Sequence, residues 1–111
     1  MTPSDFLKKQ FGIKTTFRKS IVTISSINTN YSLVPADPSR LGLIVTCLPG
    51  KTPVITDNAT DITSGLFQLS GYVDFKIDFL NAGTLLMKDL YVYDITNSLY
   101  NIYITEILSI N

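Results

Sequence analysis

The sequence predicts an all-β protein, an antiparallel β-sandwich or jelly roll of about eight short strands with a short N-terminal helix or arm. Residues that suit a pleated surface are abundant in the 111-residue chain, with 13 Ile, 13 Thr, 6 Tyr and 6 Phe. Apolar and polar residues alternate over several short runs, and Pro, Gly and Asn separate these runs. The length is near that of a common single domain, so one sandwich accounts for the chain.

The clearest alternation lies in residues 72–79. One face of this run is apolar and carries Val73, Phe75, Ile77 and Phe79. The opposite face is charged and carries Asp74, Lys76 and Asp78. Such a pattern predicts a strand with one face in the core and one face in water.

A rigid turn precedes the most apolar run of the chain. Pro35 and Pro38 fix φ and favour extended conformations in the residues before them, which predicts a turn at Asp37-Pro38. Arg40 follows this turn and leads into residues 41–47, LGLIVTC, which we expect to be a strand buried on both faces or nearly so. Asp37, Pro38 and Arg40 are therefore the expected structural residues where the turn meets this strand.

Further strands are expected at residues 15–27, 31–34, 54–56, 66–70, 85–94 and 100–110. In the first of these, Ile21, Val22 and Ile24 lie too close together for a clean alternation. We therefore expect a bulge near Ser25 and Ser26.

Basic residues gather at the N-terminus. Residues 1–19 hold five bases and one acid, whereas the rest of the chain holds four bases and eight acids, so the formal net charge is zero. We expect residues 1–14 to be a basic docking arm and residues 15–111 to be the sandwich domain. Ser4 can cap a short helix that is ordered only when docked, and a frayed tail is the alternative. The candidate docking residues are Phe6, Leu7, Lys8, Lys9 and Phe11.

The cysteine count and the hydropathy pattern restrict the compartment. Cys47 is the single cysteine, so no internal disulfide forms, and this favours a reducing cytoplasm. The N-terminus lacks the apolar stretch of a signal peptide, and no run approaches the length of a membrane span. We expect no membrane partner. Nucleic acid is not an expected partner either, because the arm is poor in Arg and the body would repel phosphate.

Composition excludes most enzyme classes. The chain has no His, so Ser-His and Cys-His pairs and His-based metal sites are excluded. Cys47 lies in a predicted core strand, where a free thiol acts as a small hydrophobe. Asp74 and Asp78 share a strand face, but Lys76 between them favours a solvated charged strand over a glycosidase pair. We therefore expect no catalytic residue, no metal, no cofactor and no enzymatic activity.

Two groups of residues keep ligand binding open as an alternative. Tyr91 and Tyr93, with Tyr103, can form an aromatic platform for a sugar ring, or else pack across strands or at a subunit interface. Residues 57–61 offer oxygens to calcium, but the spacing lacks the Gly and Glu of an EF-hand, so a polar turn is favoured.

Arg40 allows two interpretations. An arginine where a core strand begins usually donates hydrogen bonds to nearby carbonyls or pairs with a carboxylate, here Asp37 or Glu106. The alternative is a direct contact with a partner protein. We favour the structural role.

Three segments resemble a pattern of small bacteriophage virion proteins: LVPADPSRLGLIVT (33–46), SGLFQLSGYVDFKIDF (64–79) and YNIYITEIL (100–108). In that pattern a Pro-Ala-Asn/Asp-Pro-x-Arg turn feeds an apolar strand, and an Ile-Thr-Glu strand ends the domain. The resemblance covers residues 31–108. The chain departs from it at residues 47–49, where the pattern usually has an Asn-rich segment.

The resemblance implies a structural protein of the virion, made in the bacterial cytoplasm of the host and present in many copies. Its expected place is in capsid decoration, a head fibre or the tail, and its expected partners are further copies of itself and other virion proteins. The alternative function is a carbohydrate- or host-receptor-binding module at the tip of a fibre or tail. Fold resemblance alone does not fix a function.

Overall fold

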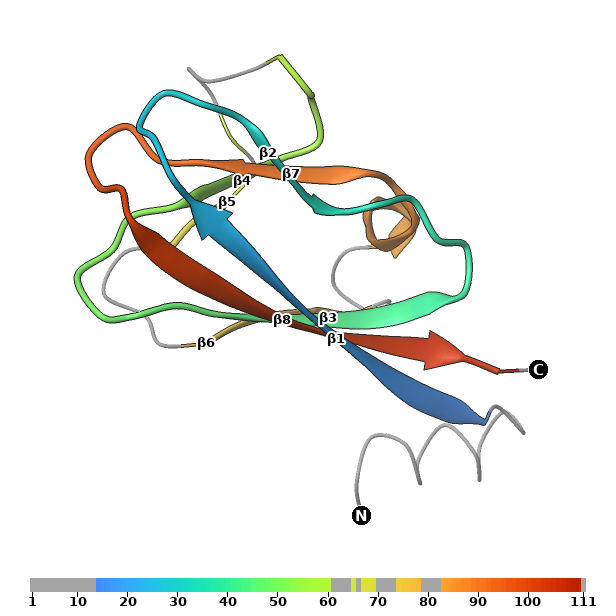
Figure 1. Ribbon diagram of the computed structural model, residues 1–111. Helices are drawn as coiled ribbons and strands as arrows, with labels where there is room; N and C mark the ends of the chain where they lie inside the picture. Colours follow the sequence, from blue (N-terminus) through green and yellow to red (C-terminus); the bar gives the residue numbers. More distant parts are fainter. Residues whose placement is uncertain (1–13, 61–64, 66, 70–73, 79–82, 111) are drawn as a thin grey trace.

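The computed structural model describes residues 14–60, 65, 67–69, 74–78 and 83–110. These residues form eight strands and one short 3₁₀ helix (Figure 1). In chain order the elements are β1 (Thr15–Ile24), β2 (Tyr31–Val34), β3 (Arg40–Thr46), β4 (Val54–Thr56), β5 (Phe67–Gln68), β6 (Asp74–Asp78), η1 (Gly83–Met87), β7 (Leu90–Tyr93) and β8 (Tyr100–Ser109). The predicted all-β class is confirmed.

The strands form two antiparallel four-stranded sheets. The order in the first sheet is β1-β8-β3-β6, and the order in the second sheet is β2-β7-β4-β5. Figure 1 shows the two sheets as two layers, with β2 and β7 above β3 and β8. The arrangement is a β-sandwich in its general form. The jelly roll stays a prediction, because this strand order establishes the two sheets and not that topology.

The core lies between the two sheets. The strands in the middle of each sheet supply its most buried side chains, among them Ile104 of β8, Leu43 of β3, Val92 of β7 and Ile55 of β4, each at most 1% exposed. Strand β8 alternates between buried and more exposed positions along its whole length. This period of two places one face of the strand in the core and turns the other outward.

Strand β3 is the central apolar strand that the sequence predicts. Leu43 and Val45 on its inner face are fully buried, and Cys47, directly after the strand, is 2% exposed. Ile44 and Thr46 on its outer face are half-buried. One face therefore lies in the core and the other is half-buried, so full burial, expected for both faces or nearly so, is reached on one face only.

Strand β1 forms one edge of the first sheet, and its pairing with β8 is unbroken. The register runs from Thr15 opposite Ser109 to Ile24 opposite Tyr100. The bulge expected near Ser25 and Ser26 is absent, because the strand ends at Ile24. The start of β1 and the end of β8 extend past the second sheet (Figure 1), which leaves most of β1 exposed on both faces.

The register does shift elsewhere. Between Arg40 and Gly42 the pairing of β3 with β8 slips by one residue, which places Gly42 opposite Ile107. A Cβ atom at Gly42 would lie 3.1 Å from Cδ1 of Ile107. Glycine at this position therefore lets the Ile107 side chain lie close over the strand.

The strand expected over residues 85–94 is only partly formed. Its first part is the 3₁₀ helix η1, Gly83–Met87, and only Leu90–Tyr93 is strand. Gly83 adopts a φ of 57°, a left-handed conformation that glycine accepts without steric cost. The chain therefore turns and coils before it enters β7.

Several predictions fall on residues outside the described part of the chain. The arm and its docking residues, Phe6, Leu7, Lys8, Lys9 and Phe11, are among them. In the alternating run of β6, Ile77 is buried, Phe75 is half-buried and Lys76 is exposed, as the pattern predicts. Val73 and Phe79 lie outside the described residues.

Candidate functional site

Arg40 is one of the most buried large side chains in the protein, at 1% exposed. Its Nε donates to Glu106 Oε2 at 2.8 Å, and Glu106 is itself 2% exposed. The two terminal nitrogens donate to backbone carbonyls, Nη1 to Lys88 at 3.3 Å and Nη2 to Pro35. Arg40 therefore joins the proline turn, the chain before β7 and strand β8. Hydrogen bonds to carbonyls and a pair with Glu106 are the contacts expected of a structural arginine.

Arg18 of β1 completes a network of four charged side chains. Its Nε and Nη2 donate to Glu106 Oε1 and Oε2, both at 2.9 Å, and Nη2 also donates to Asp37 Oδ2 at 3.0 Å. Asp37 Oδ1 in turn accepts from the backbone N–H and the hydroxyl of Ser39, at 2.9 and 2.6 Å. We call Arg18, Asp37, Arg40 and Glu106 the clamp.

The charges of the clamp support one another. Burial alone would raise the pKa of Glu106, but the hydrogen bonds and charges of Arg18 and Arg40 outweigh it and lower the pKa below its ordinary 4.5. Hydrogen bonds from Ser39, followed by those from Arg18, lower the pKa of Asp37. The clamp has two positive and two negative charges, so it fixes the turn and the edge strand rather than presenting a charge to a ligand.

A second buried polar group lies where β7 ends. Asp94 is fully buried, and its Oδ2 accepts from the hydroxyl of Tyr100 at 2.6 Å. Its Oδ1 accepts from the backbone N–H groups of Thr96 and Asn97, at 2.8 and 2.9 Å, and from the hydroxyl of Thr52 at 3.2 Å. These bonds tie the loop after β7 to the start of β8.

Burial, hydrogen bonds and charge together set the pKa values in this second group. Burial would raise the pKa of Asp94, but its hydrogen bonds, first that from Tyr100, outweigh burial and lower it. Burial and the bond to Asp94 raise the pKa of Tyr100. Burial and the charge of Asp94 raise the pKa of the Cys47 thiol, so this cysteine is not an activated nucleophile.

The outer face of the first sheet carries exposed apolar side chains. Phe17 and Ile21 of β1 are 59% and 61% exposed, and Tyr103 of β8 is 48% exposed. Phe17 lies opposite Ile107, and Ile21 lies opposite Tyr103. We call these four residues the apolar face.

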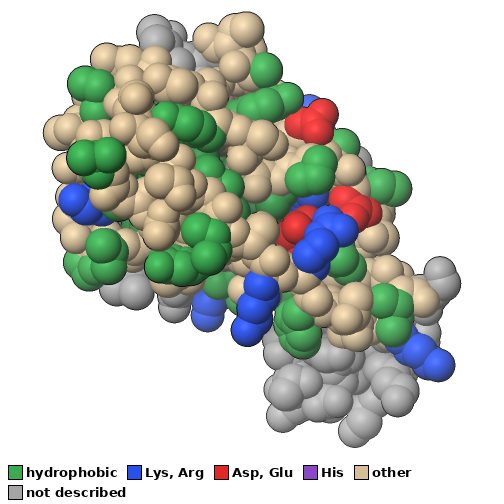
Figure 2. All heavy atoms as spheres, viewed as in Figure 1, with side chains coloured by type: hydrophobic (Ala, Val, Ile, Leu, Met, Phe, Trp, Pro, Cys, Tyr) green, Lys and Arg blue, Asp and Glu red, His purple; other side chains and the backbone are tan. Residues whose placement is uncertain are grey.

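Charge is unevenly distributed over the side of the molecule that Figure 2 shows. Figure 2 shows a side of the molecule on which acidic side chains occur in one region, next to basic ones, while apolar side chains recur over the remainder. Few charges are thus available to keep other proteins away from large areas of this side.

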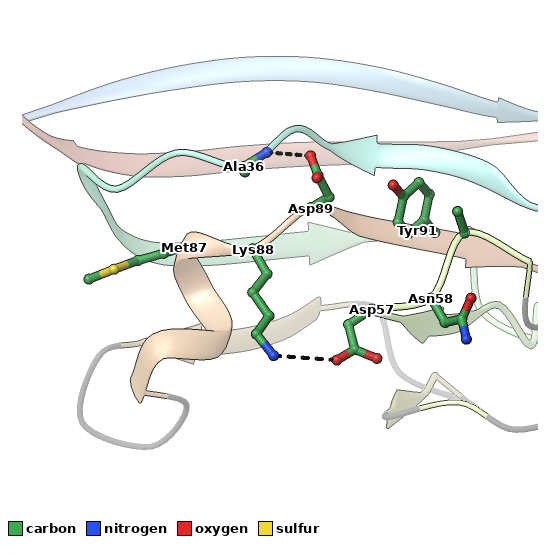
Figure 3. A pocket seen from close by; sticks show the side chains of 8 residues that line it. Ala36, Asp57, Asn58, Met87, Lys88, Asp89 and Tyr91 are labelled. Atoms are coloured by element: carbon green, nitrogen blue, oxygen red, sulfur yellow. Dashed lines mark hydrogen bonds and ion pairs between the residues drawn. The ribbon is translucent and has the colours of Figure 1, made fainter.

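A hollow of about 700 Å³ opens beside η1 (Figure 3). Its lining comes from the turn after β2, the loop after β4, the end of η1 and β7, and consists of Ala36, Asp57, Asn58, Ala59, Met87, Lys88, Asp89 and Tyr91. Asp89 Oδ1 accepts from the backbone N–H of Ala36 at 2.7 Å, and Lys88 Nζ lies 3.7 Å from Asp57 Oδ2. The lining of the hollow therefore combines one aromatic ring with hydrogen-bond donors and acceptors, among them one positively charged and two negatively charged side chains.

The loop that forms one wall of the hollow is held by hydrogen bonds. Asn30 Nδ2 donates to the carbonyls of Asn58 and Ala59, both at 2.9 Å. Asn58 Oδ1 accepts from the backbone N–H and the hydroxyl of Thr60, both at 3.0 Å. These bonds give the polar turn that the sequence favours at this place.

The three tyrosines proposed as one platform are not brought together. Tyr91 lines the hollow in the second sheet, whereas Tyr103 lies on the outer face of the first sheet. Tyr93 is 3% exposed, so its ring is buried rather than presented to a ligand. The sequence did not predict that other residues cover Tyr93.

Two kinds of feature are absent from the described residues. No three His, Cys, Asp or Glu side chains gather there closely enough to hold a metal ion. Among the same residues, no helix has both the length and the apolar character needed to cross a membrane.

No protein-family model matches the chain, and no curated protein is significantly similar to it.

Sequence reasoning missed Arg18 and Asp94. Arg18 enters the sequence argument only as one of the five bases of residues 1–19, although it lies among the β-branched residues of a predicted strand, where a paired charge is expected. Asp94 follows an apolar strand and precedes Thr96 and Asn97, a polar sequence typical of a side chain that caps its own turn. Both signals were present in the sequence. The partners of Arg18 are 19 and 88 positions away along the chain, whereas Thr96, Asn97 and Tyr100 lie within six positions of Asp94.

Proposed function

We propose that this protein is a non-enzymatic structural protein of a bacteriophage virion, which assembles with itself or docks on other proteins of the capsid, portal or tail. The observation that carries the proposal is the apolar face on the outer side of the first sheet. The resemblance of residues 31–108 to small virion proteins supplies the context. On this proposal the chain is made in the cytoplasm of the host bacterium and then incorporated in the particle.

The apolar face supports docking because its residues form two rows across neighbouring strands. Phe17 with Ile107, and Ile21 with Tyr103, are directly opposite pairs on β1 and β8. Covering a large apolar side chain stabilises a complex by about 2 kcal/mol if it becomes fully buried. Exposed clusters of this kind mark protein-interaction surfaces more often than isolated apolar residues do.

The edge strand supports a partner with acidic character. Among the described residues, β1 is ten residues long and lies at the edge of the first sheet, where its charged side chains are accessible to a partner. Lys19 is exposed between the two apolar rows, and Lys14 lies just before the strand. Arg18 is already held in the clamp, so these two lysines supply the charge that a partner would meet. The two remaining lysines of the proposed arm, Lys8 and Lys9, add to it.

Mass spectrometry of purified virions from the phage that encodes this chain tests its place in the particle. We expect the chain to be present in many copies. Its absence from the purified virion would contradict the proposal.

A surface variant tests the apolar face itself. Replacing Phe17 by Ser and Ile21 by Thr should abolish incorporation of the chain into particles, while the circular dichroism spectrum and melting temperature stay unchanged. The matched control is Ile95→Thr, which removes an apolar side chain 54% exposed in a loop, away from this sheet. Incorporation of the double variant at the level of the control would exclude the apolar face as the docking surface.

Deletion of residues 1–13 tests the arm separately. The truncated chain should keep its fold, because β1 begins after the deleted residues, and should lose attachment to the particle. Unfolding of the truncated chain would show that these residues belong to the core of the domain.

A further inference from the structure

We propose that the hollow beside η1 is a binding site for a neutral saccharide, with the ring of Tyr91 as its stacking surface. The site is distinct from the apolar face, because it lies on the second sheet and its neighbouring loops. The inference does not depend on the proposed docking of the first sheet. It would add recognition of a sugar to a structural protein.

Tyr91 supplies the apolar contact that a sugar ring needs. Its side chain is half-buried, between Leu90 and Val92, which are both fully buried in the core. The neighbouring strand positions thus hold the tyrosine while part of its ring faces the hollow (Figure 3). A pyranose presents a patch of C–H groups, and amphipathic aromatic rings suit such half-exposed surfaces.

Polar groups around Tyr91 are held in place before a ligand arrives. The bond from the Ala36 N–H fixes Asp89 through Oδ1, and Oδ2 remains as an acceptor. The bonds from Thr60 fix the amide of Asn58 through its oxygen, and its NH₂ group remains as a donor. Asp89 and Asn58 thus offer an acceptor and a donor from two different segments of the lining, and sugar hydroxyls both donate and accept.

Asp57 and Lys88 are the remaining polar side chains of the lining, and a ligand can easily replace the contact between them. Their side chains point toward one another in Figure 3, with 3.7 Å between Lys88 Nζ and Asp57 Oδ2. Both are partly exposed, 57% for Lys88 and 37% for Asp57, and such an ion pair contributes little to stability. A hydroxyl group can therefore replace either partner of this pair at small cost.

The charge of the lining selects the class of saccharide. Two carboxylates, Asp57 and Asp89, oppose one ammonium group, Lys88, so the lining has a net charge of −1. A phosphate or carboxylate on the ligand would be repelled. The hollow also has the volume of an ordinary small-molecule site, a few hundred to a thousand Å³. The combination fits an uncharged sugar ring rather than an anionic one.

Titration of the ¹⁵N-labelled full chain with glucose, galactose, mannose and N-acetylglucosamine, followed by NMR, tests the site. At least one of these sugars should give saturable shifts confined to amides of residues 57–60 and 87–91. Tyr91→Ala should weaken that binding tenfold or more, and Tyr91→Phe should retain it. The matched control is Tyr103→Ala, which removes a half-exposed tyrosine from the first sheet and should bind as the unaltered protein does.

Three results would overturn the inference. They are the absence of shifts at these amides with all four sugars, equal binding by the folded Tyr91→Ala variant, or tighter binding of glucose 6-phosphate than of glucose. The heteronuclear spectrum of each variant reports its folding in the same experiment. Incorporation of the Tyr91 variants into particles is expected to be normal, so failure at this site and failure of the docking proposal are distinguishable.

Discussion

Glu106 lies directly opposite Arg18 in the pairing of β8 with β1, and both of its carboxylate oxygens accept from that guanidinium at 2.9 Å. Glu106 also accepts from Arg40 on its other side, so one buried carboxylate joins the edge strand to the central strand of the first sheet. A bidentate arginine pair of this kind is geometrically specific. It fixes the register of β1, whose side chains are otherwise mostly exposed.

Replacing Glu106 by Gln should lower the free energy of unfolding by about 3 kcal/mol, because Arg40 would keep a buried positive charge without its carboxylate. Urea denaturation followed by circular dichroism measures the change. Arg18→Gln is the control. The Arg18 side chain is 46% exposed, so this substitution should lower the free energy of unfolding by clearly less. Equal losses in the two variants would contradict the view that burial of Arg40 makes the clamp important.

Acid should destabilise the protein through carboxylates whose pKa values are lowered in the folded state. Glu106, Asp37 and Asp94 all have a pKa below their ordinary value, 4.5 for Glu106 and 3.8 for the aspartates. Each therefore stabilises the fold above its ordinary pKa, and this contribution is lost as the pH falls through the folded-state pKa. We expect a constant free energy of unfolding from neutral pH to about pH 5 and a decrease below it.

Urea denaturation at a series of pH values measures this acid dependence. Glu106→Gln should make the decrease shallower, since a glutamine does not titrate. If the acid dependence of Glu106→Gln equals that of the unaltered protein, Glu106 contributes nothing to it.

Tyr100→Phe should lower the free energy of unfolding by about 2 kcal/mol, because Asp94 would keep its buried charge and lose a short hydrogen bond. The pKa of Asp94 should also rise, since the bond from Tyr100 is the strongest of the contacts that lower it. Thermal and urea denaturation measure the first effect. Tyr103→Phe removes a hydroxyl from a half-exposed ring and should leave stability unchanged, and a similar loss in both variants would argue against a special role for Asp94.

Cys47 should react with a thiol reagent about 1,000-fold more slowly in the folded protein than in urea, because it is buried and its raised pKa disfavours the thiolate. Absorbance of the released thiolate from Ellman's reagent measures the rate. The control places the cysteine one residue later, as Leu48→Cys with Cys47→Ala, where the native side chain is 56% exposed. Rapid labelling of Cys47 in the folded protein would show that this part of the core opens readily.

Much of the fold was predictable because its strands alternate with a period of two. The bounds of β2 and β4 agree with the prediction, and β8 falls within the predicted run 100–110. The segment before β7 was wrongly predicted as strand, since apolar residues without alternation fit a buried strand and a 3₁₀ turn equally well. Local pattern does not separate these two.

The candidate sites were less predictable, because their members meet only through long-range pairing. Arg18 and Glu106 are 88 positions apart in the sequence, and only the β1–β8 register makes them neighbours. Tyr91 could be singled out as an aromatic residue on a strand, but its partners in the hollow come from loops after two other strands. The sequence indicated which charged and aromatic residues could form a site, but only the strand topology determines which of them are in contact.

The two outer strands of the first sheet, β1 and β6, run in opposite directions, because all three pairings between them are antiparallel. If a second copy lay beside the first in the same orientation, β6 of the second copy would run antiparallel to β1 of the first. Adding further copies in the same way would extend the sheet without limit. Lys19 stands on that margin as a solvated charge, which opposes such growth. The Lys19→Thr variant should consequently form fibres visible by electron microscopy. If this variant stays monomeric or in small oligomers, a feature of the edge other than Lys19 prevents the growth.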